Sequence, residues 1–330
     1  MKALVTGSSG FVGGHLVRHL LQHGYEVSCL VRATSEPGAL AGLPIARVSG
    51  SYFDPESLRR AVRGMDVVFH VGAVLSAPDW PGYFKANVEG TANLLDACAR
   101  SDPLPRRFVL VSSIAAAGPA RDKKPLRETD DCRPVSLYGK SKYLAEQAAA
   151  AVSPRLPIVI VRPANVLGVG QQELLAVMRL LRRRIVPLVG RREKQTSICF
   201  VQDLVRALVL AAEQERAAGR TYFVAANEAY SWREITAQLL RAMDVKFVLK
   251  IPHPVLLGVA FVAEIFAGLT GGKPLVTRAD LRSARDNYWL CDPGRIRAEL
   301  GFRTEVEFAA GIRDIVRRFQ ADSGAGETGA

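Results

Sequence analysis

The sequence is poor in cysteine and has no pair of cysteines at the spacing of a metal or redox motif. Five cysteines occur among 330 residues, an odd number with wide gaps and no C-x-x-C pair. This pattern argues against a disulfide framework and against a zinc site. We expect reduced, mostly buried thiols and no bound metal.

Long apolar runs are also missing. The longest, Val255–Leu269, is interrupted by Glu264 and is shorter than the ~20 residues that a membrane-spanning helix needs. We expect a buried or groove-lining helix here. The less favoured alternative is peripheral membrane contact, because an apolar helix beside basic residues can lie in the interface. The first residues reach Gly7 before an export signal could form, so we expect a cytoplasmic protein.

Acidic residues are in deficit, since 32 Asp and Glu face 44 Lys and Arg and the net charge is +12. The sharpest basic cluster, in residues 179–194, has no interleaved aromatic residues, so nucleic acid is the least favoured partner. A solvated face, or a phosphate or carboxylate on a small molecule, explains the excess better. With 48% hydrophobic residues the chain can bury a large core, which excludes a disordered protein.

Short β-branched runs alternate with amphipathic segments in the first half of the chain, a pattern typical of βαβ units. Near-continuous apolar strands between such helices predict a parallel sheet covered on both faces. The expected strands are 2–6, 26–31, 46–49, 66–71, 108–112, 158–161, 198–201 and 221–225. The expected helices are 11–22, 55–63, 83–100, 136–152, 171–184 and 204–215, with mostly helical structure from 231 onward.

A glycine loop, Gly7-Ser8-Ser9-Gly10-Phe11-Val12-Gly13, connects the first expected strand to a helix. Gly7 permits a tight turn, Gly10 lets the backbone approach a pyrophosphate, and Gly13 allows the helix to pack closely on the strand. The helix N-terminus then offers N–H groups to the anion. We therefore predict a bound dinucleotide rather than a Gly-rich turn without a ligand.

Arg32 follows the second expected strand, where an NAD enzyme commonly has Asp or Glu for the ribose 2′-hydroxyl. A cation here can pair with a 2′-phosphate, so NADP is favoured and NAD is the alternative. A solvated arginine is the other interpretation of this residue.

Together these features predict an α/β fold with a Rossmann-type doubly wound parallel sheet and a smaller, mostly helical C-terminal substrate domain. Residues 1–165 would form the dinucleotide-binding domain, and 198–225 would return to it. Residues 166–197 and 226–320 would form the substrate-binding domain, and 321–330 a flexible tail.

Tyr138 and Lys142 are four residues apart on an expected helix, so their side chains lie one turn apart on one face. A neighbouring ammonium stabilises a phenolate and makes tyrosine a better acid or base near neutral pH. This spacing also recurs on solvated helices. The catalytic interpretation is supported by Ser112 and Ser113, which follow an expected strand at the edge where such sheets bind ligands. A serine at the end of a strand is more often a turn or cap residue.

In these features the chain resembles the extended short-chain dehydrogenase/reductase family, also called the NAD-dependent epimerase/dehydratase group. The resemblance covers nearly the whole chain. Its segments, in order, are TGSSGFVG (6–13), DVVFHVGA (66–73), NVEGT (87–91), VSS (111–113), YGKSK (138–142) and RPANVLG (162–168). The resemblance implies that Tyr138 is the acid/base, that Lys142 binds the nicotinamide ribose and lowers the tyrosine pKa, and that Ser113 hydrogen-bonds the reacting oxygen.

The resemblance implies further roles. Asn87 resembles an asparagine near the lysine, with bracing of a helix as the alternative, and His70 is expected to be a packing residue beside the cofactor segment at Gly72. The predicted catalytic residues are Ser113, Tyr138, Lys142 and Asn87. The predicted cofactor-binding residues are Gly7, Ser9, Gly10, Phe11, Val12, Gly13, Arg32, Ser51, Gly72, Tyr138, Lys142 and Pro163.

Two departures from the family pattern bear on the ligands. The family often has Asp beside the adenine, where Ser51 would have to serve in this chain. Sugar-nucleotide members commonly have Arg before the strand at 198–201; its absence here weakens that reading, although Arg191, Arg192 or Lys194 could replace it. The remainder, including Trp289 and the Leu300-Gly301-Phe302 segment, is closer to the hydroxysteroid dehydrogenase and dihydroflavonol reductase-like branch.

The expected activity is therefore NAD(P)-dependent interconversion of a ketone and a secondary alcohol on an apolar sterol-, flavonoid- or polyketide-like substrate. The alternatives are a nucleotide-sugar epimerase or dehydratase with a recycled bound cofactor, and a non-catalytic NAD(P)-sensing protein. The family also implies a homodimer.

Overall fold

A seven-stranded sheet forms the centre of the computed structural model, which describes residues 1–34, 38–121, 123–187, 195–270 and 288–327. The strand order is β10-β6-β5-β4-β1-β2-β3, and every neighbouring pair is parallel. The strands are β1 (Lys2–Thr6), β2 (Glu26–Val31), β3 (Ala46–Ser49), β4 (Val67–His70), β5 (Arg107–Val111), β6 (Ile158–Pro163) and β10 (Thr221–Val224). The predicted Rossmann-type sheet is confirmed.

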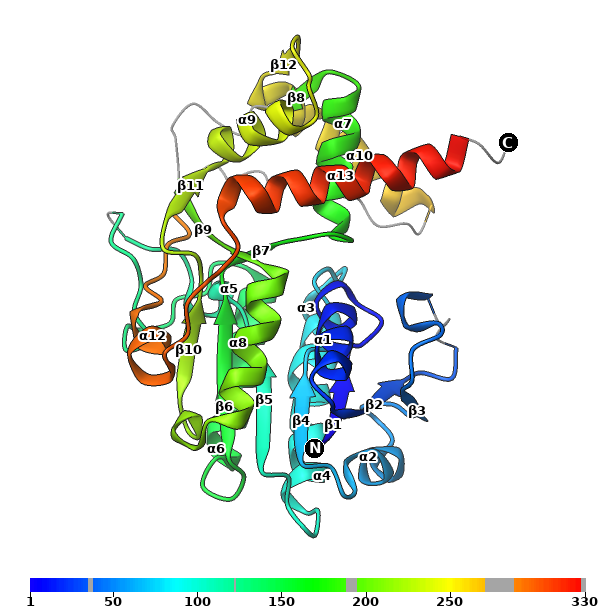
Figure 1. The fold of residues 1–330 in the computed structure, drawn as a ribbon, viewed down its shortest axis with the longest axis vertical. Helices are drawn as coiled ribbons and strands as arrows, with labels where there is room; N and C mark the ends of the chain where they lie inside the picture. Colours follow the sequence, from blue (N-terminus) through cyan, green and yellow to red (C-terminus); the bar gives the residue numbers. More distant parts are fainter. Residues whose placement is uncertain (35–37, 122, 188–194, 271–287, 328–330) are drawn as a thin grey trace.

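Helices cover both faces of this sheet because its strands are apolar on both sides (Figure 1). One face packs against α1 (Phe11–Gln22) and α8 (Val201–Glu213). The other packs against α2 (Pro55–Val62), α4 (Gly90–Ala99) and α6 (Leu137–Val152). Along β1 the side chains alternate, with Ala3 and Val5 in the first cluster and Leu4 in the second.

The register brings the carboxyl ends of the central strands to one edge. Thr6 lies opposite Leu30 and His70, and Val111 lies opposite Val161. In doubly wound sheets this edge binds ligands.

A second region lies beyond that edge, with its own apolar core (Figure 1). It contains a three-stranded sheet of β7 (Asn165–Leu167), β9 (Gln195–Phe200) and β11 (Ala229–Ser231), and a two-stranded sheet of β8 (Ile185–Pro187) and β12 (Leu249–Ile251). Its helices are α7 (Gln172–Arg182), α9 (Trp232–Ala242), α10 (His253–Thr270) and α13 (Phe308–Glu327). The predicted mostly helical C-terminal part is confirmed, while the exact domain boundaries stay a prediction.

The structure of this region has details that the sequence does not predict. Strands β7, β8, β11 and β12 are not predicted by the sequence, since each has only three residues. Residues 321–327 continue α13 where a flexible tail is expected. Helix α10 is buried on one side only: Ala260 is 5% exposed, whereas Val259 and Val262 are 61% and 65% exposed. None of the helices in the described ranges has the length and apolar character that a bilayer crossing requires.

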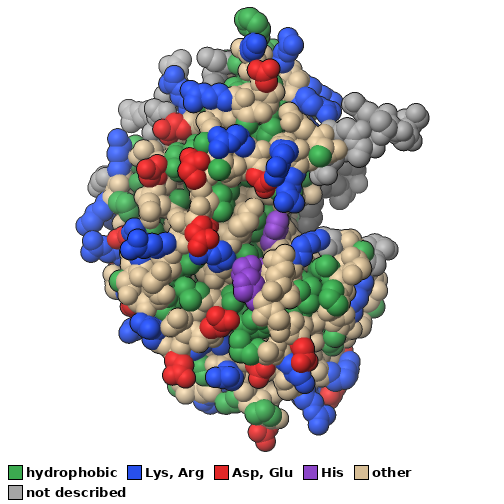
Figure 2. All heavy atoms as spheres, viewed as in Figure 1, with side chains coloured by type: hydrophobic (Ala, Val, Ile, Leu, Met, Phe, Trp, Pro, Cys, Tyr) green, Lys and Arg blue, Asp and Glu red, His purple; other side chains and the backbone are tan. Residues whose placement is uncertain are grey.

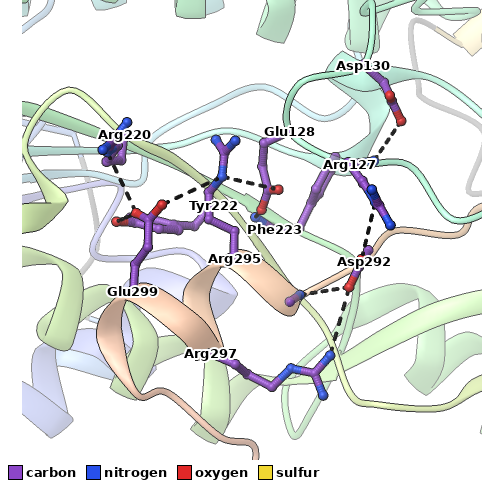
Figure 3. A network of polar contacts seen from close by, with 11 residues as sticks. Arg127, Glu128, Asp130, Arg220, Tyr222, Phe223, Asp292, Arg295, Arg297 and Glu299 are labelled. Carbon is purple, nitrogen blue, oxygen red and sulfur yellow. Dashed lines mark hydrogen bonds and ion pairs between the residues drawn. The ribbon is translucent and has the colours of Figure 1, made fainter.

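A polar network fastens α12 (Gly294–Leu300) to the sheet (Figure 3). Glu299 accepts a 2.8 Å hydrogen bond from the Tyr222 hydroxyl and lies 3.7 Å from Arg220. Glu128 accepts from the Phe223 amide at 2.8 Å and lies 3.7 Å from Arg295. The network thereby ties the C-terminal segment to β10.

The surplus cations are dispersed on the face seen in Figure 2, where Lys and Arg alternate with Asp and Glu. Several are paired on their own helix, such as Arg100 with Asp96 at 2.7 Å and Arg317 with Asp314 at 2.6 Å. This arrangement favours the solvated-surface interpretation of the charge excess.

Candidate active site

The glycine loop is built for close backbone approach. Gly7 has a φ of +69°, and a Cβ on it would lie 2.5 Å from the Gly72 Cα. A Cβ on Gly13 would lie 2.1 Å from the Gly7 carbonyl oxygen, which leaves room only for glycine where α1 crosses the loop. The Gly10 amide donates to the Gly7 carbonyl at 3.0 Å and closes the turn.

The N-terminus of α1 suits an anion. Gly10 is the N-cap, no side chain caps the helix, and its first turn has no acidic residue. The exposed Ser9 and the half-buried Phe11 and Val12 surround these amides. The loop and helix end therefore fit the pyrophosphate of a dinucleotide.

The remaining predicted cofactor residues lie on the same edge of the sheet. Arg32 is exposed directly after β2, and Pro163 is buried at the end of β6. Gly72 follows β4 and contacts Gly7. The exposed Ser51 follows β3; its hydroxyl accepts from the Phe53 amide at 3.2 Å.

Tyr52, which the sequence analysis did not single out, also contacts this segment. A Cβ on Gly72 would lie 2.1 Å from the Tyr52 hydroxyl, so the hydroxyl fills space that any other residue at 72 would need. Burial raises the pKa of Tyr52 to about 12, and the Thr6 side chain acts in the opposite direction. Tyr52 therefore packs under the loop as a neutral phenol.

Tyr138 meets Ser113 at the end of β5. The Ser113 side chain lies beside the Tyr138 phenol and lowers its pKa as a hydrogen-bond partner does. Ser113 also caps α5 (Ile114–Ala117) by accepting from the Ala115 amide at 3.1 Å. Gly139 permits the approach, because a Cβ there would lie 2.3 Å from the Ala115 carbonyl oxygen. The structure thus brings together the predicted serine and tyrosine.

The pKa of Tyr138 differs from the expectation. Burial raises it to about 12, although the hydrogen bond with Ser113 acts in the opposite direction, and the nearby Tyr83 adds to the rise. The family resemblance implies a lowered value. In the protein alone, desolvation of the phenol is the larger effect, so Tyr138 is a proton donor at neutral pH.

Lys142 lies one turn after Tyr138 and is 2% exposed. Its Nζ donates a 2.7 Å hydrogen bond to the carbonyl of Val111, which is the last residue of β5. Burial lowers the pKa of Lys142 to about 8, and the charge of Glu146 opposes that fall. The ammonium is therefore still the main form at pH 7.

Asn87 is buried within a π-helical turn, Phe84–Glu89, a form that often marks functional positions. Its amide group accepts from the Val74 amide at 2.7 Å and donates to the Val74 carbonyl at 3.0 Å. It also donates to the Ser141 hydroxyl at 2.9 Å. Asn87 thus connects the segment at Val74 to Ser141, the residue before Lys142, and its catalytic role stays a prediction.

His70 is a packing residue, as expected. It is 1% exposed, and its two ring nitrogens bond Thr6 at 2.7 Å and Thr91 at 2.9 Å. Burial, with a smaller contribution from the Lys142 charge, lowers the pKa of His70 to about 3. The neutral ring therefore spans β1, β4 and α4 behind the site.

Glu146 is not among the residues predicted from the sequence, although it lies four positions after Lys142 on the same helix face. Glu146 is 3% exposed and forms an ion pair with Arg162, which is 6% exposed. The observation that marks Glu146 is its buried ion pair with Arg162 one helical turn after Lys142, which cannot be predicted from the sequence.

A family model described as the NAD dependent epimerase/dehydratase family matches residues 3–225. The chain is 30% identical to a 2-alkyl-3-oxoalkanoate reductase of Stenotrophomonas maltophilia, over 96% of this chain and 98% of that protein. It is 31% identical to a 3 beta-hydroxysteroid dehydrogenase/Delta 5-->4-isomerase of Mycobacterium tuberculosis, over 73% and 69%.

Solved structures agree with these matches. A dTDP-glucose 4,6-dehydratase from Streptomyces venezuelae, crystallised with NAD, is 25% identical with a TM-score of 0.79. The alignment covers 98% of each chain. The chain is thus similar along nearly its whole length to a protein named as a reductase and to one named as a dehydratase, and over 73% of its length to one named as a dehydrogenase.

Proposed function

The chain belongs to the NAD-dependent epimerase/dehydratase family of NAD(P)-dependent oxidoreductases, and from this premise we propose that it interconverts a ketone and a secondary alcohol. The observation that carries the proposal is that the Ser113 side chain lies beside the Tyr138 phenol, with Lys142 one helical turn after Tyr138 on α6. Ser113 follows the carboxyl end of β5, and the glycine loop follows the carboxyl end of β1, so both lie at the same edge of the sheet.

Each side chain has a task that its surroundings support. Ser113 and Tyr138 hold the carbonyl oxygen, and Tyr138, protonated at neutral pH, gives its proton to that oxygen during reduction. Lys142 stabilises the phenolate that this transfer leaves. When bound, the nicotinamide cofactor supplies or accepts the hydride. The loop from Gly7 to Gly13 and the start of α1 would hold its pyrophosphate.

An apolar substrate is supported by the surface around Tyr138. Leu137 and Val135, on the approach to α6, are 47% and 55% exposed. Leu75 is 62% exposed, and its carbonyl accepts from Tyr83, the phenol that acts electrostatically on Tyr138. Exposed aliphatic side chains beside a polar reacting group are typical of sites for apolar ligands.

We further propose NADP as the preferred cofactor. The supporting observation is the exposed guanidinium of Arg32 directly after β2, where a 2′-phosphate would be bound.

The direct test is a substrate screen with both NADPH and NADH over sterol-like, polyketide-like and nucleotide-sugar compounds. The expected result is stoichiometric consumption of NADPH with an apolar ketone. Turnover of a nucleotide sugar without net change in NAD(P)H would replace this proposal by the epimerase or dehydratase alternative. That alternative draws support from the dehydratase similarity. Its candidate diphosphate cations, Arg191, Arg192 and Lys194, lie outside the described residues.

A further inference from the structure

Ser112 lies between the two residues that organise the site. The carbonyl of its neighbour Val111 accepts a hydrogen bond from the Lys142 ammonium. The side chain of its other neighbour, Ser113, lies beside the Tyr138 phenol. The Ser112 side chain points to neither, because its hydroxyl donates to Glu146 Oε1 over 2.5 Å. Ser112 therefore fixes the backbone from which both contacts are made.

Glu146 is in turn held by Arg162 at two points. Arg162 Nε donates to Glu146 Oε1 at 2.9 Å, and Nη2 donates to Oε2 at 2.6 Å. Ser112, Glu146 and Arg162 are 4%, 3% and 6% exposed. A two-point ion pair of this kind fixes direction as well as distance. The three residues join the ends of β5 and β6 to the middle of α6, and we call them the β5 clamp.

The clamp also determines the charge around Lys142. Two titratable groups act electrostatically with this buried ammonium: Glu146 from α6 and His70 from β4. Arg162 from β6 is paired with Glu146, and Tyr138 lies one turn before Lys142 on α6. His70 is neutral near pH 7. Glu146 is therefore the anion that favours the charged form of Lys142, while burial disfavours it.

We propose that Glu146, oriented by Arg162, is a positioning residue that keeps Lys142 charged and, through Ser112, holds Ser113 and the Val111 carbonyl in place for the reaction. The proposal rests on the proposed function for its kinetic part only, because the charge of Lys142 can be measured without turnover. A buried ion pair with a purely structural role would affect folding stability but not the titration of Lys142.

The test uses the full chain carrying Glu146→Gln, which keeps an oxygen for Ser112 and removes the charge. Lysine side chains labelled with ¹³C at Cε are titrated by NMR, and the Lys142 signal is assigned with Lys142→Arg. We expect the Lys142 midpoint to fall by about one pH unit or more in Glu146→Gln. Glu146→Asp, which keeps the charge, should restore part of the shift. An unchanged midpoint in Glu146→Gln overturns the charge role whether or not a substrate has been found.

The second variant, Ser112→Ala, leaves the Glu146–Arg162 pair in place and releases the strand end. With the substrate from the screen, we expect kcat to fall about 10-fold or more at nearly constant KM, without a shift of the Lys142 midpoint. Wild-type kcat in Ser112→Ala overturns the positioning role. If Glu146→Gln fails to fold, the double variant Glu146→Gln/Arg162→Gln removes the pair without leaving a buried unpaired charge. An unchanged Lys142 midpoint in that variant overturns the charge role.

Discussion

The sheet region and the C-terminal region use apolar residues in opposite ways. In the sheet region Leu4, Phe69 and Phe108 are fully buried, and the strands are apolar on both faces. In the C-terminal region, Phe247, Leu249 and Val259 are 78%, 67% and 61% exposed. The buried side chains of the sheet region thus hold the strands, and with them the carboxyl ends of the strands, in fixed positions. The other region has a buried core of its own and also leaves these apolar side chains exposed, so the two regions differ in how completely they bury their apolar surface.

The largest effect should come from the sheet region. Tyr138→Phe removes the proton donor but keeps the ring, so turnover should fall roughly 10²–10⁴-fold while cofactor affinity changes little. Single-turnover kinetics and a cofactor-binding titration check both parts. If the phenylalanine variant retained activity, the assignment of the acid/base would be wrong.

Acid should weaken the sheet region through His70. Its pKa is about 3 in the folded protein, against ~6.5 in the unfolded chain, so the unfolded state takes up the proton first as the pH falls. The free energy of unfolding should therefore decrease between about pH 6.5 and pH 3, by on the order of 4 kcal/mol. His70→Gln should flatten this dependence in urea unfolding series; a variant with the wild-type slope would contradict the assignment to His70.

A matched pair of glycine substitutions compares the two regions directly. Gly13→Ala places a methyl group 2.1 Å from a backbone oxygen, so we expect a loss of about 3 kcal/mol in unfolding free energy and of cofactor binding. Gly258→Ala on α10 meets no atom within 4 Å and should gain up to ~1 kcal/mol. Denaturant unfolding measures both. Equal effects would show that α10 is packed as tightly as the loop.

Arg32→Ser should weaken NADPH binding about 10-fold and leave NADH binding nearly unchanged, because only NADPH has the 2′-phosphate. Arg60→Ser, at an exposed position of α2, is the control and should alter neither affinity. Fluorescence titration with both cofactors gives the ratio. Tighter NADH than NADPH binding in the wild-type protein would remove the charge argument.

The smallest effect should come from the contact between the regions. Asp292 accepts from the Gly294 amide at 2.8 Å and lies 3.7 Å from Arg127, with a side chain that is 36% exposed. Asp292→Asn should cost no more than ~1 kcal/mol, because solvent screens such pairs. The difference from wild type should shrink in high salt. A larger, salt-independent loss would mean that this contact is part of the core.

The contrast between the regions also explains what the sequence could predict. The expected strands at 2–6, 26–31 and 46–49 match β1, β2 and β3 residue for residue. β1 and β2 are buried strands, which leave a strong local apolar pattern, whereas β3 is a largely exposed strand at the edge of the sheet. The strand expected at 198–201 in fact spans Gln195–Phe200. It pairs with the three-residue strands β7 and β11, whose sequences are too short for a period to be seen.

The candidate site divides in the same way. Motif order led to Ser113, Tyr138, Lys142 and the glycine loop, and the structure brings Ser113 and Tyr138 into contact. The pKa of Tyr138 and the contacts of Glu146 could not be predicted, because both depend on burial by residues distant in the chain. Asn87 could be singled out from its motif, but its hydrogen-bond partners Val74 and Ser141 could not be predicted from the sequence.

The path of the chain has a further consequence for unfolding. After β6 the chain leaves the main sheet, returns with α8 and β10, leaves again through α9, and returns with α12 before ending in α13 (Figure 1). No single cut separates the two regions, so neither can be expressed as one continuous fragment. Opening of one region must strain the connections to the other. We therefore expect a single cooperative transition, and limited proteolysis should not release a stable half of the molecule.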